Sequence, residues 1–312
     1  MLALSDIDGT LNNEHVPESE RIHTIGPARE AIETLQRCGI LVGICTARAQ
    51  GEAELYAEAV GARGWLISEN GACSTSPQGE RMTIGDMREI RECVAAIEER
   101  LGRPLVTTLD REALEARWQK QVTARREGKD ASSPIHENDL SHSTVEALRV
   151  SAARVASAYI SGLALGERAI AIAIAEAYGF RPFGDLLHLI HRRADKGVAL
   201  DGLCESFRGQ EVSARDASGC RKSVRIDRVT PIVFGNGEND LPLFASAIER
   251  GGYGVLVGDP VRDCGFHFDI QKRPPHRNTV LTYGAPFGHG MKAAIPVLIS
   301  RVRNEYGIAL ER

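Results

Sequence analysis

Apolar and polar residues along the chain form blocks that predict strands and helices in turn. Strands are predicted at residues 2–5 and 40–45, and the second is apolar throughout, as is typical of a strand buried on both faces of a parallel sheet. A helix is predicted after each strand, from about Pro27 to Cys38 and from Thr46 to Val60, and a third strand follows at residues 65–67. This order indicates a Rossmann-like, doubly wound α/β sheet.

The pattern changes after about residue 80. A helix is predicted there with every third or fourth residue apolar, and a polar run at residues 128–142 with little apolar content predicts an exposed loop. The other elements expected in this part are strands at 105–107, 158–161 and 186–190 and helices at 111–127 and 167–178. These elements predict an α+β module inserted at residues 81–190.

The first pattern returns after residue 190. It predicts helices at 195–207 and 241–250 and strands at 231–234 and 254–257, whereas the polar segment 208–228 is expected to be irregular. We therefore predict a Rossmann-like core of residues 1–80 and 191–312, interrupted by the inserted domain.

Composition excludes several classes of protein. The 312 residues carry 38 Lys and Arg against 42 Asp and Glu, so there is no overall positive charge to hold a nucleic acid. No apolar run reaches the roughly 20 residues of a membrane-spanning helix, and the start of the chain has no signal-peptide pattern. Seven scattered cysteines without a CxxC pair favour reduced thiols, so we expect a cytoplasmic protein. No feature of the sequence indicates an oligomeric state.

The strongest chemical signal is the run from Asp6 to Thr10, Asp-Ile-Asp-Gly-Thr, directly after the first strand. Ligands of α/β sheets bind at the carboxyl ends of the strands, so Asp6 and Asp8 should face the binding crevice. One carboxylate can attack phosphorus while the other exchanges protons with the leaving alcohol and with water. A polar turn is the simpler alternative, and a calcium loop is excluded because Pro17 stands where its bidentate Glu should be.

Two further residues are candidates for holding phosphate oxygens. Thr46 follows the second strand, where its hydroxyl and the start of the next helix could bind an anion, or where it could simply cap that helix. Lys196 lies at the start of a predicted helix, a position where the helix dipole disfavours a cation. A ligand would explain that placement, and an ordinary solvated lysine is the alternative.

The loop from Phe234 to Asp240, Phe-Gly-Asn-Gly-Glu-Asn-Asp, again joins an apolar strand to a helix. Its short oxygen-bearing side chains suit a hard cation, and magnesium is the usual companion of phosphate. Taken alone, it is a common type of loop.

In this order along the chain, the four elements resemble the four motifs of the haloacid dehalogenase superfamily in its phosphatase form. The inserted module between the second and third motifs resembles a C2 cap, in the subclass of sugar phosphatases. Within it the chain is most similar to the mannosyl-3-phosphoglycerate phosphatases, through His188 and four short runs: Glu69 to Ala72, Asp195 to Gly197, Asn239 to Pro242 and Gly284 to Gly288.

The resemblance implies a role for each motif residue. Asp6 would be the nucleophile, Asp8 the general acid and base, and Thr46 and Lys196 would hold the phosphoryl group. Mg²⁺ would lie between Asp6, the carbonyl of Asp8 and the last motif. The remaining residues implied are Asn236 and Asp240 at the metal, with Asp240 also able to orient Lys196 or a water molecule, Asn239 in support, and Arg48, Asn70 and His188 toward substrate.

One position departs from the family pattern. An Asp normally follows the Gly of the fourth motif, and this chain has Asn236, whose amide brings no negative charge to the metal. We expect a magnesium-dependent phosphatase that acts on a small phosphorylated sugar or glycosyl-phosphoglycerate through an aspartyl-phosphate. A phosphomutase of the same superfamily is an alternative. A protein that binds a phosphorylated ligand without turnover is another, motivated by Asn236.

Overall fold

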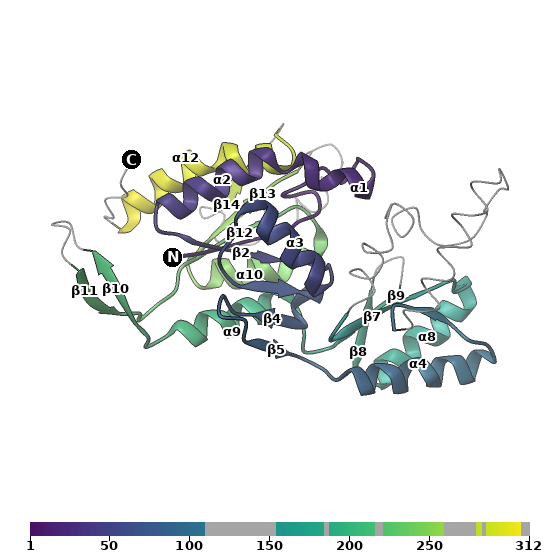
Figure 1. Cartoon of the computed structure of the whole chain (residues 1–312). Coiled ribbons are helices and arrows are strands. Elements are labelled where there is room, and N and C mark those ends of the chain that lie inside the picture. The colour runs from purple at the N-terminus through teal and green to yellow at the C-terminus, as the bar shows by residue number, and fades with distance from the viewer. Residues whose placement is uncertain (110–153, 184–186, 216–220, 259–278, 283–284, 307–312) are drawn as a thin grey trace.

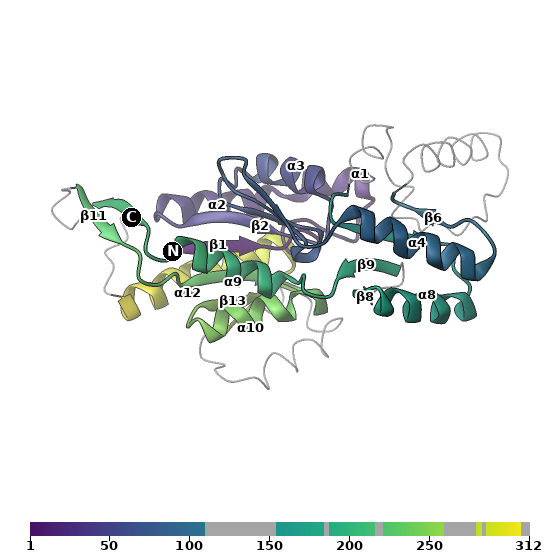
Figure 2. The same cartoon turned by 90° about the horizontal axis from the view of Figure 1, so that it is seen from below.

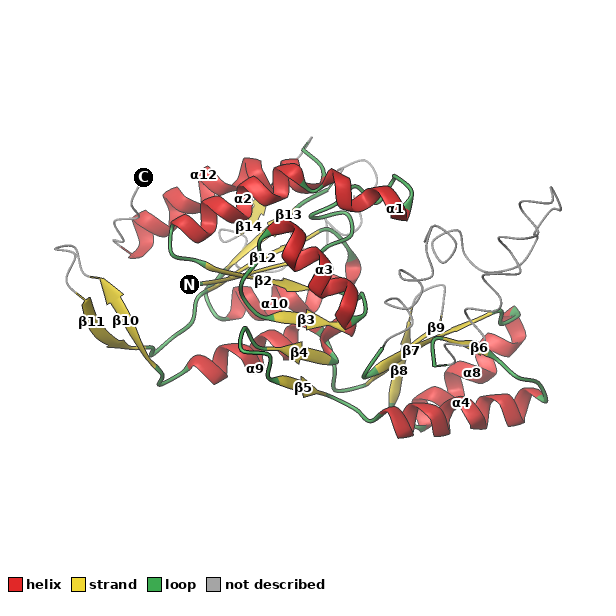
Figure 3. Cartoon of the chain, in the orientation of Figure 1, coloured by secondary structure: helices red, strands yellow, loops and turns green. Residues whose placement is uncertain are grey.

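The computed structural model describes residues 1–109, 154–183, 187–215, 221–258, 279–282 and 285–306. The predicted helix at 111–127 and the loop at 128–142 lie outside these ranges. Figure 3 shows the described helices and strands. The helices are α1 Glu18–Arg21, α2 Gly26–Arg37, α3 Gln50–Val60, α4 Met87–Leu101, α8 Leu165–Ala177, α9 Lys196–Phe207, α10 Leu241–Glu249 and α12 Phe287–Tyr306.

An eight-stranded sheet forms the larger part of the molecule (Figure 1). Six neighbouring strands are parallel, and β4 and β5 extend one edge in antiparallel fashion. In spatial order the strands are β14 Thr279–Leu281, β13 Tyr253–Leu256, β12 Pro231–Gly235, β1 Leu2–Ser5, β2 Leu41–Cys45, β3 Leu66–Ser68, β4 Cys73–Thr75 and β5 Arg81–Thr83.

Helices cover both faces of this sheet because its central strands are apolar on both sides. Ala3 of β1 belongs to the core beneath α2, α3 and α12, and its neighbours Leu2 and Leu4 belong to the core beneath α9 and α10. The view from below in Figure 2 shows α9 and α10 together on the second face. The predicted doubly wound α/β sheet is therefore confirmed.

A second, four-stranded antiparallel sheet carries α4 and α8 on one face. Its spatial order is β6 Val106–Thr107, β7 Ser157–Ser161, β9 Leu187–His191 and β8 Phe180–Phe183. The helix predicted after residue 80 is α4, and its side chains Ile90, Val94 and Ile97 are buried against the sheet. The α+β character expected of the inserted module is present, although β5, at the start of the predicted insertion, pairs with β4 of the large sheet.

The prediction that residues 208–228 are irregular is wrong. They contain an antiparallel pair, β10 Glu211–Arg215 and β11 Arg221–Arg225, which stands away from the rest of the chain in Figure 1. Charged residues at both ends of each strand hide the apolar alternation that would have indicated a hairpin. Helix α3 also begins four residues later than expected, because Thr46 to Ala49 form a turn before it.

Candidate active site

The carboxyl ends of three adjacent parallel strands bring the first, second and fourth motifs together. β1 lies between β2 and β12, so Asp6, Thr46 and Asn236, which follow these strands, meet at one edge of the sheet. The main chain locks this edge, since the Asp6 N–H donates to Phe234 O at 2.9 Å and the Thr46 N–H donates to Ile67 O at 2.8 Å. We call this edge the catalytic edge.

Lys196, the first residue of α9, joins the motifs into one ionic chain. Its Nζ donates to Asp6 Oδ1 at 2.7 Å and to Asp240 Oδ1 at 2.6 Å. The Lys196 side chain is fully buried, so the alternative of a solvated lysine is excluded. Two carboxylates around one buried ammonium explain why a cation is tolerated at the start of this helix.

Asp240 connects Lys196 to the fourth motif. Its second oxygen, Oδ2, accepts hydrogen bonds from the backbone N–H groups of Asn236 at 3.0 Å and Gly237 at 3.1 Å. A Cβ on Gly235 would lie 2.6 Å from this oxygen, so glycine is required for the loop to close around the carboxylate. Both Asp240 oxygens are therefore engaged within the protein, one by the lysine and one by the loop.

These contacts set the charges of the cluster. Burial raises the pKa of Asp6 to about 7, the charge of Asp240 adds to the rise, and Lys196 opposes it. Burial alone would lower the pKa of Lys196, but Asp240 and Asp6 outweigh it and raise the value, so the ammonium stays charged. Asp6 is thus a carboxylate that ionises near neutral pH beside a permanent positive charge.

Asp8 lies two residues from Asp6 but in different surroundings. Arg48 grips it with two hydrogen bonds, from Nε to Oδ2 at 2.8 Å and from Nη2 to Oδ1 at 2.7 Å, while Asn12 and Arg21 contact Oδ1 at 3.2 and 3.3 Å. Burial by itself would raise the pKa of Asp8, yet Arg48, followed by Asn12 and Arg21, lowers it to about 2. Asp8 is therefore ionised in this structure, although its side chain is 32% exposed.

Arg48 is accordingly not an exposed residue of a surface helix. It precedes α3, its side chain is 10% exposed, and it also contacts Glu52 Oε1 at 3.1 Å and the Tyr56 ring at 5.0 Å. Thr46 does not cap α3 either, because Ala49 occupies that position. The Thr46 hydroxyl oxygen accepts from the Arg48 N–H at 3.3 Å, and the residue is 1% exposed.

Asn236 reaches from β12 across to the first motif. Its Oδ1 accepts from the Thr10 hydroxyl at 3.2 Å, and a Cβ on Gly9 would lie 1.9 Å from its Nδ2. Glycine is therefore required at position 9 for two reasons: its φ is +72°, and the Asn236 side chain leaves no room for a Cβ atom. Among the described residues, no three His, Cys, Asp or Glu side chains converge as a metal site. The donors available at this edge are oxygen atoms, which suit a hard cation, and the Asn236 amide is the donor among them that brings no negative charge.

Asn70 and His188 come together on the side of the catalytic edge nearest the small sheet. Asn70 Nδ2 lies 3.5 Å from His188 Nδ1, and both residues are buried. Asn70 is 3% exposed, so it is not part of an exposed Asn-Gly turn, although it has φ of 55° and ψ of 36° and its neighbour Glu69 has φ of 52°. Asn239, the supporting residue of the fourth motif, places its Oδ1 2.7 Å from where a Cβ of Gly237 would be.

The family model for haloacid dehalogenase-like hydrolases matches residues 3–211, more than half of the chain. The chain belongs to this family. No curated protein matches it.

Solved structures show the same fold at low identity. A haloacid dehalogenase-like hydrolase from Bacillus subtilis has 18% identity and a TM-score of 0.55, with 95% of this chain and 99% of that chain covered. BT1666 from Bacteroides thetaiotaomicron, described among the phosphatases of the superfamily, has 13% identity and a TM-score of 0.54, with 94% and 93% covered. TM0651 from Thermotoga maritima has 17% identity and a TM-score of 0.54, with 95% and 96% covered.

The family motifs account for Asp6, Lys196 and Asp240, but several residues that contact the site carry no such pattern. Arg21 reaches Asp8 from α1, and Arg154, three residues before β7, donates to Ala47 O in the loop after Thr46. Neither occupies a recognisable motif, so only the folded backbone could reveal them. The capping of α9 by Asp195, whose carboxylate accepts from the Val198 N–H at 2.7 Å, is a signal that sequence could have used.

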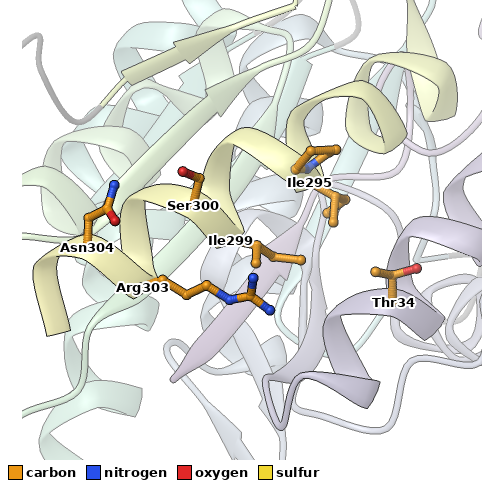
Figure 4. Close-up of a pocket in the computed structure, with 7 residues that line it drawn as sticks. Thr34, Ile295, Ile299, Ser300, Arg303 and Asn304 are labelled. Atoms are coloured by element: carbon orange, nitrogen blue, oxygen red, sulfur yellow. The ribbon is translucent and has the colours of Figure 1, made fainter. Parts of the chain in front are cut away.

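A groove between α2 and α12 is separate from this site (Figure 4). The two helices run side by side with Gly288 against Ala28, and the groove lies toward their other ends. It is lined by Thr34, Ile295, Pro296, Ile299, Ser300, Arg303 and Asn304. In the parts of the chain that are described, no helix is long and apolar enough to cross a membrane.

Proposed function

We propose that this haloacid dehalogenase-like hydrolase is a magnesium-dependent phosphatase that works through an aspartyl-phosphate on Asp6. The observation that carries the proposal is the buried chain from Asp6 through Lys196 to Asp240. The Asp6 carboxylate, the proposed nucleophile, contacts a fixed positive charge, which would stabilise the negative charge that develops on a transferred phosphoryl group. Thr46 at the next strand end would hold a second phosphoryl oxygen.

The proposed reaction has two steps. Asp6 forms a bond to phosphorus as the ester P–O bond breaks, and the leaving oxygen takes a proton from Asp8. Water then gives a proton to Asp8 and attacks phosphorus, which releases inorganic phosphate and restores Asp6. The structure has Asp8 ionised in the grip of Arg48, the form that accepts a proton from water. Before the first step Asp8 must be protonated, which requires that Arg48 loosen its contact.

A magnesium ion would be held by Asp6, the backbone carbonyl of Asp8 and the amide oxygen of Asn236. When bound it neutralises negative charge at the reacting group. Asp240 has both oxygens engaged by Lys196 and the 236–237 backbone, so we assign it to orienting Lys196. The low charge of this donor set predicts weak magnesium binding.

For the substrate we propose a small phosphorylated sugar or a glycosyl-phosphoglycerate, with the small sheet acting as a cap over the catalytic edge. The phosphatase description of BT1666 supports the reaction class. Closeness to the mannosyl-3-phosphoglycerate phosphatases stays a prediction. We also propose a cytoplasmic location, which agrees with the five described cysteines, none of which forms a disulfide.

Two observations favour a second candidate, a protein that binds a phosphorylated ligand without turning it over. Asn236 contributes no negative charge to the proposed metal donors, and the hydrogen bonds from Arg48 stabilise Asp8 in its ionised form rather than its protonated one. The test is phosphate release from p-nitrophenyl phosphate and from a panel of phosphorylated sugars, with magnesium and with EDTA. We expect magnesium-dependent release that Asp6→Asn abolishes. Binding of a phosphorylated ligand with no release from any substrate would establish the second candidate instead.

A further inference from the structure

The antiparallel pair of β10 Glu211–Arg215 and β11 Arg221–Arg225, which we call the hairpin, projects from the core at the end remote from the small sheet (Figures 1 and 2). It follows the last turn of α9 and precedes β12, so it lies beyond the amino end of β12, whereas the catalytic edge is at the carboxyl end. Among the described residues, neither strand of the hairpin has a further neighbouring strand. A two-stranded sheet is at best marginally stable in water, so an added strand would stabilise it.

The register of the hairpin divides its residues between two faces, because successive residues of a strand alternate. One face is polar and consists of three facing pairs: Glu211 and Arg225, Ser213 and Ser223, and Arg215 and Arg221. The other face is mostly apolar and consists of two facing pairs: Val212 and Val224, and Ala214 and Lys222. Like charges directly opposite each other destabilise a sheet, so the pair of arginines is unfavourable within the hairpin. A negative charge on the other side of Arg215 would relieve it.

The two outer edges of the hairpin differ in charge. The sequence of β11 is RKSVR, with three basic residues among five, and charged residues, lysine above all, protect an edge strand from pairing with another chain. The sequence of β10 is EVSAR, with uncharged residues at its three central positions and opposite charges at its two ends. The edge of β10 is therefore the one that can accept another strand.

The charges at its two ends make β10 complementary to a second copy of itself. A two-fold axis through Ser213 pairs β10 antiparallel with β10 of another copy, and Glu211 then lies opposite Arg215 of that copy. The symmetry forms this pair twice, and it also brings Val212 opposite Ala214 of the second copy. Opposite charges that face each other across two strands stabilise a sheet, and here the negative charge also relieves the pair of arginines within each hairpin.

Other pairings of the hairpin are less favourable. A two-fold pairing of β11 with itself places Arg221 opposite Arg225 of the second copy, twice. A pairing of β10 with β11 of another copy repeats the contact of Arg215 with Arg221, and it leaves an edge open at each end, so it would continue into a fibre. When β10 pairs with itself, the two copies of β11 are three strand spacings apart, about 14 Å, which exceeds the screening length of about 8 Å at physiological salt.

We propose that β10 is a dimerisation strand, through which two copies of this chain form a four-stranded sheet in the order β11, β10, β10, β11. The dimer leaves the catalytic edge of each copy open and does not depend on the proposed phosphatase activity. Five residues of each chain take part in the pairing, which makes a small interface, so we expect a dissociation constant in the micromolar range.

The test reverses the charges at the two ends of β10. Sedimentation velocity of the full-length protein, with a reducing agent present, measures the monomer–dimer equilibrium at micromolar concentrations. In a symmetric dimer, Glu211→Arg places two arginines opposite each other and Arg215→Glu places two glutamates opposite each other. Each variant should therefore dimerise about tenfold more weakly than the wild-type protein.

A mixture of these two variants is the decisive measurement. In a dimer of one Glu211→Arg chain and one Arg215→Glu chain, every charged end of β10 again faces an opposite charge. The mixture should therefore dimerise about as tightly as the wild-type protein, a recovery that an unfolded hairpin could not produce. Lys222→Glu is the matched control, because it makes the same change of charge on β11, and it should leave the dissociation constant close to that of the wild-type protein.

Three results would overturn the proposal. A wild-type protein that stays monomeric throughout the micromolar range does not form this dimer. A dimer that neither charge reversal weakens, or that the mixture fails to restore, is formed by another surface. A monomeric wild-type protein that binds heparin, with an affinity that Arg215→Glu and Lys222→Glu lower equally, assigns the hairpin to an acidic polymer instead.

Discussion

Asp6 and Asp8 are two residues apart, yet their surroundings give them opposite properties. Asp6 is 4% exposed and shares one buried ammonium with Asp240, whereas Asp8 opens toward solvent and is held by Arg48 and Arg21. The pKa of Asp6 is raised to about 7 by burial, and that of Asp8 is lowered to about 2 by arginine contacts that outweigh its burial. Two residues of the same type therefore acquire opposite pKa shifts from their partners, and the roles that we propose for them, nucleophile for Asp6 and proton carrier for Asp8, have to be tested separately.

Under the proposed mechanism, the comparison also indicates which group must change during the reaction. Asp6 is buried and its Oδ1 accepts from Lys196, which Asp240 holds in turn, so the proposed attack by Asp6 needs no rearrangement of these partners. The Asp8 cluster is arranged for the ionised form and must release Arg48 before Asp8 can donate a proton. The predictions below separate these two behaviours.

After the loss of all turnover expected for Asp6→Asn, the largest effect is expected from Asp8→Asn. General acid–base assistance contributes about 10²- to 10⁴-fold, so kcat for an alkyl phosphate should fall by that factor. Hydrolysis of p-nitrophenyl phosphate should fall less in the first step, because its leaving group needs little protonation. Steady-state and burst kinetics on both substrates measure this. Identical losses on the two substrates would argue that Asp8 does not protonate the leaving oxygen.

The next largest effect is on stability, from Lys196→Met. Removing the ammonium leaves Asp6 and Asp240 buried without their partner, a change that costs about 3–5 kcal/mol of unfolding free energy. Urea denaturation at pH 8 measures it. Lys292→Met is the control, because Lys292 forms an exposed pair with Glu30, whose loss should cost about 1 kcal/mol or less. A loss for Lys196→Met no larger than the control's would contradict the charge balance assigned to this cluster.

The large sheet and the catalytic edge were predictable because their determinants are local. Asp6, Thr46 and Asn236 each follow an apolar strand directly, and parallel pairing carries the ends of β1, β2 and β12 to one edge. Lys196 was found through a helix start where a cation is unfavourable. Each of these signals lies within a few residues of the side chain it identifies.

The partners of these residues were not predictable for the opposite reason. Arg48 was expected to face substrate, and the fold instead places it on Asp8, 40 positions earlier in the chain. Arg154 reaches Ala47 across 107 positions, and the choice between such contacts depends on side-chain packing that no local pattern encodes. The hairpin of β10 and β11 was missed because its backbone pairing is not accompanied by a clear apolar alternation.

A smaller effect on stability, with opposite signs at the two sites, is expected when Asp6 and Asp8 are each replaced by Asn. Asp6 has a raised pKa, so its ionisation costs stability as pH rises from its ordinary value of 3.8 through about 7. Asp6→Asn should therefore be more stable than wild type at pH 8, without magnesium, and equally stable near pH 4. Asp8 has a lowered pKa, so the stability it contributes above pH 3.8 is lost as pH falls toward 2.

Asp8→Asn should accordingly be less stable than wild type at pH 8, with a difference that shrinks as the pH falls below 3.8. At about 1.4 kcal/mol for each pKa unit, both differences should be a few kcal/mol, and the difference for Asp6 should be the larger. Urea denaturation of the three proteins across this pH range provides the measurement. Shifts of the same sign at pH 8 would show that the two carboxylates do not differ as the structure indicates.

The smallest effect is expected from Asn236→Asp, which adds one charge between the two clusters. Asn236 accepts from Thr10 through Oδ1, and an aspartate can keep that bond while bringing a negative charge to the proposed metal donors. The magnesium concentration for half-maximal activity should fall several-fold, within about 1.4 kcal/mol of binding free energy, because ligand charge governs affinity for hard cations. Turnover at saturating magnesium should change less, since Asp6 and Asp8 are untouched. Asn239→Asp is the control, because it adds the same charge to the same loop and should lower the magnesium requirement less. If the magnesium dependence of Asn236→Asp is unchanged, Asn236 is not a metal ligand, and Asp240 or Glu238 becomes the candidate ligand instead.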